Sequence, residues 1–193
     1  DGRELFSASA DQTIRRWDWN KRAAAGVLRG HRFTVNQVLA APDGRTLASN
    51  TQQGEVFLWP LDEPARPPTV RRLAATLESA VFTADGQAIL VAERGGGLAL
   101  RDLRTFAESK RWLASTPGNS NFVRLSPDAG HAALFEPDGQ VNLWNLRADS
   151  HTAIPTARGE HVVDCLFTRN ANYLVTFIQM PTNLVARIWD VRQ

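Results

Sequence analysis

A turn signal recurs along this chain at an almost constant spacing. Asp-Gly pairs begin at residues 1, 43 and 85, and related turns begin at Asp128 and Asn170. A second marker, an apolar run that ends in tryptophan or its substitute, recurs in step at Trp17, Trp59, Arg101, Trp144 and Trp189. A fixed period of about 42 residues indicates that the chain consists of copies of one supersecondary unit, each too small to bury its apolar face alone.

Within each unit the apolar residues form short runs bounded by turn-forming residues, a pattern typical of β-strands. We expect one strand after each recurrent turn, a hairpin partner that ends at the tryptophan, a strand before the turn and a weaker fourth strand. The strands after the turn are expected at 5–9, 46–50, 88–93, 131–135 and 173–177, and their hairpin partners at 14–17, 56–59 and 141–144. The strands before the turn are expected at 35–40, 77–82, 121–125 and 162–167, and the weaker fourth strands at 24–29 and 110–114. Four short strands per repeat match one blade of a β-propeller. No long helical pattern interrupts the repeat, which excludes the α/β classes.

Several segments resemble the signature of the WD-repeat family, and the resemblance extends over essentially the whole chain. They are Gly30-His31, Ala41-Pro42-Asp43-Gly44, Leu47-Ala48-Ser49, Trp17-Asp18 and Trp189-Asp190. The resemblance, closest to bacterial-type WD-repeat arrays, implies an all-β propeller with about 4.5 four-stranded antiparallel blades over residues 1–193. The expected blades are 1–30 (partial), 31–73, 74–115, 116–157 and 158–193 (partial). Since closed rings generally have six to eight blades, we expect an arc whose remaining blades come from the parent chain or from another copy.

The resemblance also implies a buried polar tetrad in each blade: a His before the first strand, a Ser or Thr in the second, an Asp in the second turn and the Trp of the third. Unsatisfied buried groups of this kind cost about 1–3 kcal/mol each. The tetrad residues expected are Ser7, Asp11 and Trp17; His31, Ser49 and Trp59; Asp138 and Trp144; and Thr176 and Trp189. Gln53 stands where the second unit needs Asp, Thr116 and Leu134 replace two members in the fourth, and Asn183 replaces Asp in the fifth. The third unit matches nowhere, with Leu73, Val91, Gly95 and Arg101 at the four places.

Enzymatic interpretations are weaker than structural ones. His31, Ser49 and either Asp11 or Asp43 suggest a hydrolase triad, but the chain has no Gly-x-Ser-x-Gly elbow. Gly95-Gly96-Gly97 has no following Lys and is interpreted as a hairpin turn. His161, Asp164 and Cys165 are too few for a closed zinc site, so Cys165 is expected in the core at a place equivalent to Val38. We interpret Glu55, Glu93, Glu136 and Asp138 as solvated turn residues. The prolines from Pro60 to Pro68 are interpreted as a rigid connection between strands. We therefore expect no enzyme activity, no metal and no cofactor.

Reversible binding of a protein or peptide is the expected function. In the family that the chain resembles, partners usually dock on the loops before the first strand and between the second and third strands. Those positions carry Arg32, Phe33, Thr34, Gln52, Arg94, Asn119, Asn121 and His161. Arg and aromatic residues are frequent hot spots of interfaces. Two alternatives stay open: an architectural or sensor module of a larger regulator with a kinase, protease or nucleotide-switch domain, and a propeller enzyme.

Charge and cysteine content narrow the partners and the compartment. The 22 basic and 20 acidic residues are spread along the chain rather than clustered, which argues against nucleic acid as a partner. No apolar run reaches the roughly 18 residues that a membrane span needs. Cys165 is the single cysteine, so no intramolecular disulfide can form, and we expect a reducing cytoplasmic location.

Overall fold

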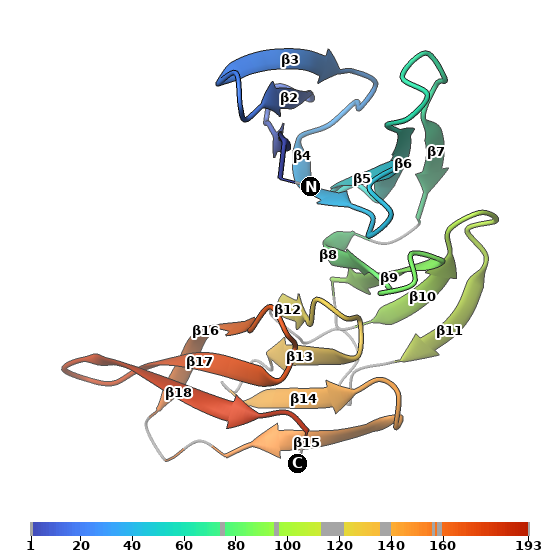
Figure 1. The fold of residues 1–193 in the computed structure, drawn as a ribbon. Coiled ribbons are helices and arrows are strands. Elements are labelled where there is room, and N and C mark those ends of the chain that lie inside the picture. Colours follow the sequence, from blue (N-terminus) through green and yellow to red (C-terminus); the bar gives the residue numbers. More distant parts are fainter. Residues whose placement is uncertain are drawn as a thin grey trace. The chain divides into compact units, whose positions relative to one another are not determined.

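The computed structural model describes residues 2–73, 76–94, 97–112, 122–135, 140–155, 157 and 160–192. These residues form eighteen strands in five antiparallel sheets of three, four, four, four and three strands (Figure 1). The described residues contain no helix with the length and apolar character that a membrane-spanning helix requires. The predicted all-β class, built of four-stranded antiparallel sheets, is confirmed.

Each sheet is a meander in which sequence neighbours pair. The first sheet contains β1 (Glu4–Ala8), β2 (Ile14–Asp18) and β3 (Ala23–Leu28), and the second contains β4 (Val35–Ala40), β5 (Thr46–Thr51), β6 (Glu55–Pro60) and β7 (Thr69–Arg72). The third contains β8 (Leu77–Phe82), β9 (Ala88–Glu93), β10 (Leu98–Asp102) and β11 (Glu108–Trp112). The fourth contains β12 (Phe122–Leu125), β13 (His131–Phe135), β14 (Val141–Asn145) and β15 (Ser150–Ile154), and the fifth contains β16 (His161–Phe167), β17 (Tyr173–Gln179) and β18 (Leu184–Asp190).

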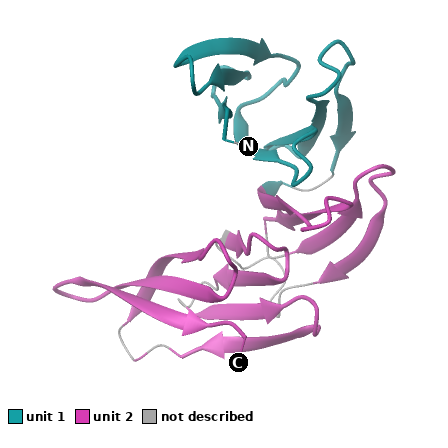
Figure 2. Cartoon of the chain, viewed as in Figure 1, with its two compact units in different colours: residues 1–77 teal, residues 78–193 magenta. Residues whose placement is uncertain are grey.

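The chain divides into two compact units, each of which contains more than one repeat: residues 1–77 and residues 78–193 (Figure 2). From here on, "unit" means one of these two parts. The first unit holds the first two sheets, and the second unit holds the other three, with the boundary at the start of β8. The proline-containing segment lies between the end of β6 at Pro60 and the start of β7 at Thr69, so it is a connection between strands as predicted.

The recurrent Asp-Gly turn has a local physical cause. The Asp43 carboxylate accepts a hydrogen bond from the Arg45 backbone N–H at 2.9 Å, and Asp85, Asp128 and Asn170 make the same contact with the residue two positions later. The residue after each acceptor has a positive φ: 67° at Gly44 and at Gly86, 54° at Ala129 and 56° at Ala171. Asp and Asn favour this turn because their short side chains bond to nearby backbone. The repeat period therefore records where each hairpin reverses.

The same register follows each of these turns. In the four repeats whose turn acceptor is described, the tryptophan-position residue pairs with the residue four positions after that acceptor, and the first sheet has the corresponding pair. The pairs are Leu5↔Trp17, Leu47↔Trp59, Ile89↔Arg101, Ala132↔Trp144 and Leu174↔Trp189. The four tryptophans therefore lie at equivalent places, as expected. Trp59 is only 5% exposed, and the other three are partly buried.

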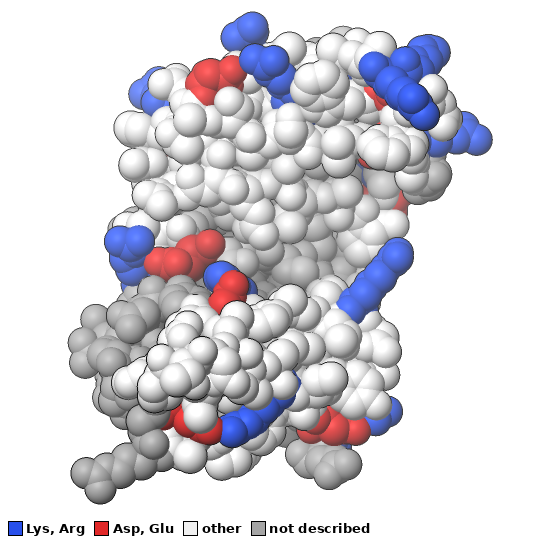
Figure 3. All heavy atoms as spheres, turned by 90° about the vertical axis from the view of Figure 1, so that its left-hand side faces the viewer, with Lys and Arg blue, Asp and Glu red and all other residues white. Residues whose placement is uncertain are grey.

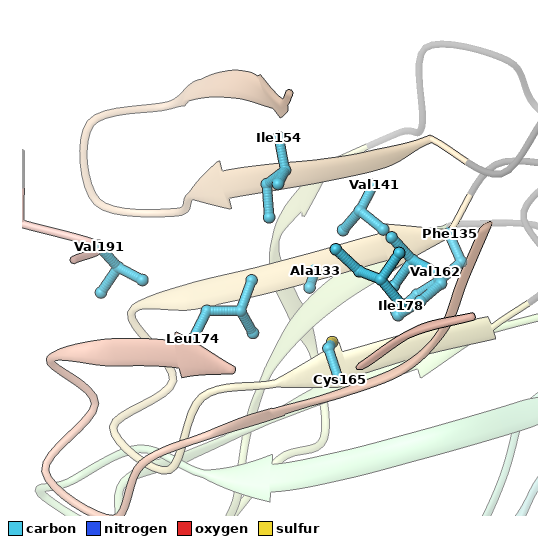
Figure 4. Packing of buried hydrophobic residues seen from close by; sticks show 9 residues of the cluster. All are labelled: Ala133, Phe135, Val141, Ile154, Val162, Cys165, Leu174, Ile178 and Val191. Atoms are coloured by element: carbon cyan, nitrogen blue, oxygen red, sulfur yellow. The ribbon is translucent and has the colours of Figure 1, made fainter. Parts of the chain in front are cut away.

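Apolar residues from neighbouring sheets form the cores inside each unit. In the first unit, Ile14 of β2 packs with Val35, Leu47, Phe57 and Trp59 of the second sheet. In the second unit, one core joins the third and fourth sheets, and another joins the fourth and fifth (Figure 4). Cys165 is 1% exposed in that last core and pairs with Thr176, as Val38 pairs with Ser49. The predicted core position of Cys165 is therefore confirmed.

Candidate functional site

A buried polar network lies inside the second sheet, where β4, β5 and β6 meet. The indole Nε1–H of Trp59 donates to the Ser49 hydroxyl at 2.8 Å, and Ser49 Oγ lies 2.7 Å from His31 Nε2. The three residues are between 2% and 6% exposed. The His31 ring also lies 4.0 Å from the Phe57 ring, centroid to centroid. The sequence placed these three tetrad members correctly.

Glu55 occupies the far side of this network, and the solvated-turn interpretation of Glu55 is wrong. Its side chain is 3% exposed, and its Oε2 lies 3.6 Å from His31 Nδ1. The sequence pattern put the acidic member at position 53, where Gln53 is exposed. Glu55 instead opens β6 directly before a buried apolar run, and its longer side chain reaches the histidine from two residues further along. A carboxylate next to the run Val56–Trp59 was the signal that the pattern missed.

The charge of His31 follows from its burial. Burial lowers the pKa of His31 below its ordinary value, and the nearby Glu55 carboxylate offsets only part of that effect. The ring is therefore neutral near pH 7. A neutral ring with its proton on Nδ1, facing Glu55, leaves Nε2 free to accept the Ser49 hydroxyl proton. Trp59, Ser49 and His31 then form a directional chain of donors and acceptors, and Glu55 lies beyond hydrogen-bond length, 3.6 Å from His31 Nδ1.

The other sheets hold shorter versions of this network. Trp17 Nε1–H donates to the Ser7 hydroxyl at 2.9 Å, and Trp189 Nε1–H donates to the Thr176 hydroxyl at 2.9 Å. Asp11 is about half exposed; the Thr13 hydroxyl and backbone N–H bond to it and lower its pKa to about 2. These tetrad positions therefore match the prediction in part.

In the fourth sheet the Trp144 indole N–H has no hydrogen-bond partner among the described residues, because Leu134 replaces the hydroxyl. The Trp144 ring instead stacks on His151 at a centroid distance of 4.5 Å. Asp138, the expected acidic member, lies outside the described residues.

Ion pairs take the place of the tetrad in the third sheet. Arg101, at the tryptophan position, pairs with Glu108 at 2.8 Å. Arg111 binds both Glu93, at 2.7 Å, and Glu108, at 2.7 Å. The Arg111 guanidinium lowers the pKa of Glu108. Glu93 is therefore a member of a charge network on β9–β11 rather than a free turn residue, which corrects its predicted role; Glu136 lies outside the described residues.

The residues proposed for catalysis do not form a reactive site. Ser49 is 2% exposed and its hydroxyl is already bonded to Trp59 and His31, so no acyl group can reach it. Asp43 lies in the turn at the other end of the second sheet. Among the described residues no group of three His, Cys, Asp or Glu side chains is arranged to hold a metal ion. Asp164 pairs with Arg124 at 3.0 Å while Cys165 is buried, so these two do not act together.

The predicted contact residues of the first unit gather around Glu55. Arg32, Phe33, Thr34 and Gln52 are exposed, and Phe33 is 41% exposed. The Arg32 backbone N–H donates to Glu55 Oε2 at 3.3 Å. Arg72, which the sequence analysis did not name, brings its Nε to 3.6 Å from Glu55 Oε1. The connection before β4 and the β5–β6 turn therefore meet at one end of the second sheet.

Of the remaining predicted contact residues, Arg94 and His161 belong to the second unit. Arg94 is exposed and pairs with Glu78 at 2.9 Å, and His161 is exposed at the start of β16. Asn119 and Asn121 lie outside the described residues. On the face that Figure 3 shows, basic side chains occur in several separated groups, most with an acidic side chain beside them.

Comparisons with known proteins agree with the repeat. A family model described as "WD domain, G-beta repeat" matches residues 24–60, which run from β3 through β6. The chain is 24% identical over 182 residues to Periodic tryptophan protein 2 of Arabidopsis thaliana, covering 91% of this chain and 19% of that protein. It is 25% identical to Protein LST8 homolog of Drosophila melanogaster and 26% identical to Target of rapamycin complex subunit wat1 of Schizosaccharomyces pombe; each match covers 75% of this chain and 48% of the relative. The chain thus spans less than half the length of each of these relatives.

Proposed function

The chain belongs to the WD-repeat family, and from that premise we propose that it is a non-catalytic scaffold that binds a protein or peptide. The binding surface is the end of the second sheet that carries Arg32, Phe33, Thr34 and Gln52. This end, together with Arg72, is called the Glu55 face below. Names of relatives such as "Target of rapamycin complex subunit wat1" and "CCR4-associated factor 4 homolog" describe members of assemblies, and they support the same role here.

The observation that carries the proposal is an exposed Arg-Phe pair held on a fixed backbone. Glu55 accepts the Arg32 N–H, and the Val35 N–H donates to the Ser9 carbonyl at 3.2 Å, so the loop is attached at both ends. A loop that is ordered before binding loses less conformational entropy when a partner docks. Phe33 supplies apolar contact area and Arg32 supplies charged donors, which are the side-chain types that dominate interface energies.

The double substitution Arg32→Ala with Phe33→Ala tests the proposal. We expect recovery of a partner in pull-down from the source cell to fall about tenfold, while the circular dichroism spectrum and melting temperature stay nearly unchanged, because both side chains are exposed. Arg45→Ala, at the opposite end of the same sheet, is the matched control and retains full recovery. Wild-type recovery in the double variant would move the interface away from the Glu55 face.

A second candidate function, an architectural module of a larger regulator, is favoured by the apolar side chains on β18. Leu184 is 57% exposed and Ile188 is 70% exposed. Exposed apolar patches on sheets mark contact surfaces. The substitutions Leu184→Ser and Ile188→Ser, made in the parent protein, would then release the segment from its neighbours in limited proteolysis. We also propose a cytoplasmic location, since the lone Cys165 thiol is buried and unpaired.

A further inference from the structure

The Glu55 face carries more positive than negative charge. The connection of residues 29–34 presents the exposed side chains of Arg29 and Arg32, and Arg72 joins it with a side chain that is 61% exposed. Gly30 brings this connection against β6, because a Cβ at Gly30 would lie 3.1 Å from the Phe57 ring. Glu55 lies beneath the arginines, and its 3% exposed side chain is enclosed by protein rather than offered to solvent.

Among the described residues at this end, two guanidinium groups have no carboxylate partner. Arg72 lies beside Glu55, and Arg15 pairs with Asp11 at 3.2 Å. Neither Arg29 nor Arg32 forms a side-chain ion pair with a carboxylate in the part of the chain that the structure describes. The described residues near this end thus include four guanidinium groups, those of Arg15, Arg29, Arg32 and Arg72, and two carboxylates, of which that of Glu55 is buried.

Apolar and amide groups lie beside these charges. Phe33 is 41% exposed next to Arg32, and the amide side chains of Gln52 and Gln53 project from the β5–β6 turn. Amides can bond to the backbone of an extended peptide, and an exposed aromatic ring can pack against an apolar side chain. Guanidinium groups bind carboxylates through two parallel hydrogen bonds.

Resting on the proposed function, we infer that the Glu55 face selects an acidic peptide segment in which Asp or Glu side chains flank an apolar residue. The carboxylates bind Arg29 and Arg32, and the apolar side chain packs on Phe33. Charge complementarity favours this partner, because an acidic segment neutralises the two unpaired arginines without displacing an existing ion pair. A nucleic-acid backbone fits less well, since such binding typically neutralises about 6–10 phosphates and this face offers two unpaired cations.

The test is fluorescence anisotropy with the full chain and a short fluorescein-labelled peptide in which Asp and Glu alternate with Leu and Ser. The matched control peptide replaces every acid by its amide. We expect the acidic peptide to bind, with an affinity that falls as salt is raised, and the amide peptide to bind at least about tenfold more weakly. Arg29→Gln and Arg32→Gln should each weaken the acidic peptide about tenfold, whereas Arg45→Gln should leave it unchanged.

Further binding measurements distinguish the possible sources of negative charge. They also distinguish the acidic preference from the proposed binding function. Tighter binding of the same peptide with phosphorylated serines would support anion recognition by the arginines. Equal binding of the acidic and amide peptides, with Phe33→Ala still weakening both, would overturn the acidic preference and leave the proposed function standing. Stronger binding of an oligouridine RNA than of the acidic peptide would overturn the inference. Binding of neither peptide would also overturn it, and the pull-down with the Arg32 and Phe33 variant would then decide the proposed function.

Discussion

Removing the Ser49 hydroxyl should destabilise the first unit more than removing the matching hydroxyl of Ser7. Ser49 serves two buried partners, the Trp59 indole at 2.8 Å and His31 Nε2 at 2.7 Å. Ser49→Ala leaves both polar atoms buried without a partner, and each such group costs about 1–3 kcal/mol. The summed penalty is about 2–6 kcal/mol. We expect the free energy of unfolding to fall by about 3 kcal/mol, because replacing Ser with Ala creates little cavity.

Ser7→Ala is the matched control within the same unit. Ser7 and Trp17 are partly exposed and share a single hydrogen bond of 2.9 Å. Water can replace that bond, so the expected loss is only about 0.5–1.5 kcal/mol. The comparison therefore isolates burial and the second hydrogen bond, since the residue type, the strand position and the tryptophan partner are the same.

Hydrogen exchange measured by mass spectrometry across a urea series provides the assay, because it reports the opening free energy of β5–β6 separately from that of the second unit. Ser49→Ala should raise exchange throughout β4, β5 and β6. Equal opening free energies in the Ser49→Ala and Ser7→Ala variants would refute the argument that the buried network stabilises the second sheet.

Two further predictions use the same assay. Trp144→Phe should cost at least about 1 kcal/mol less than Trp59→Phe, because Trp144 Nε1 has no partner among the described residues whereas Trp59 Nε1 donates to Ser49; equal losses would contradict this. The opening free energy of β4–β6 should fall as the pH falls below about 6.5, because burial lowers the pKa of His31 in the folded state and the unfolded chain then binds more protons. His31→Gln should flatten that pH dependence and His161→Gln should not; a slope that survives His31→Gln would assign the effect to another group.

The strand positions could be predicted because they depend on local sequence, namely on turn residues and on short apolar runs. In four of the five repeats, an Asp or Asn that bonds to the backbone two residues later reverses the chain, and apolar runs on either side must then pair. The strand ends shifted by one or two residues, as at β1 and β11, because the ends depend on hydrogen bonds that no apolar pattern encodes. Trp59 was recognisable as a core residue for the same reason, since its run is continuous and apolar.

The role of Glu55 could not be read from spacing, because a polar network depends on atoms rather than on residue positions. The acidic residue was expected at position 53. Glu55, two residues further along at the start of β6, approaches the same histidine with its longer side chain, so the residue spacing of the tetrad is not kept. In the third sheet, the residue at the tryptophan position is Arg101, and it forms an ion pair with Glu108 in place of a Trp–Ser hydrogen bond. In both cases a charged residue that the spacing did not predict lies where a tetrad contact was expected, while His31 Nδ1 and Arg101 Nε have no hydrogen-bond partner among the described residues.

Glu55 also connects the interior of the second sheet to its exposed end. One carboxylate oxygen faces His31 and accepts the Arg32 N–H, and the other faces Arg72. Glu55, which lies beside His31 at the end of the buried network, therefore helps to fix the backbone that presents Arg32 and Phe33. A repeat in which Trp, Ser and His are joined can hold a contact loop rigidly, whereas the Trp144 indole N–H of the fourth sheet has no partner among the described residues. The network of His31, Ser49 and Trp59 and the Glu55 face lie in the same sheet. On this argument they do so because the buried network helps to position the exposed loop of that face.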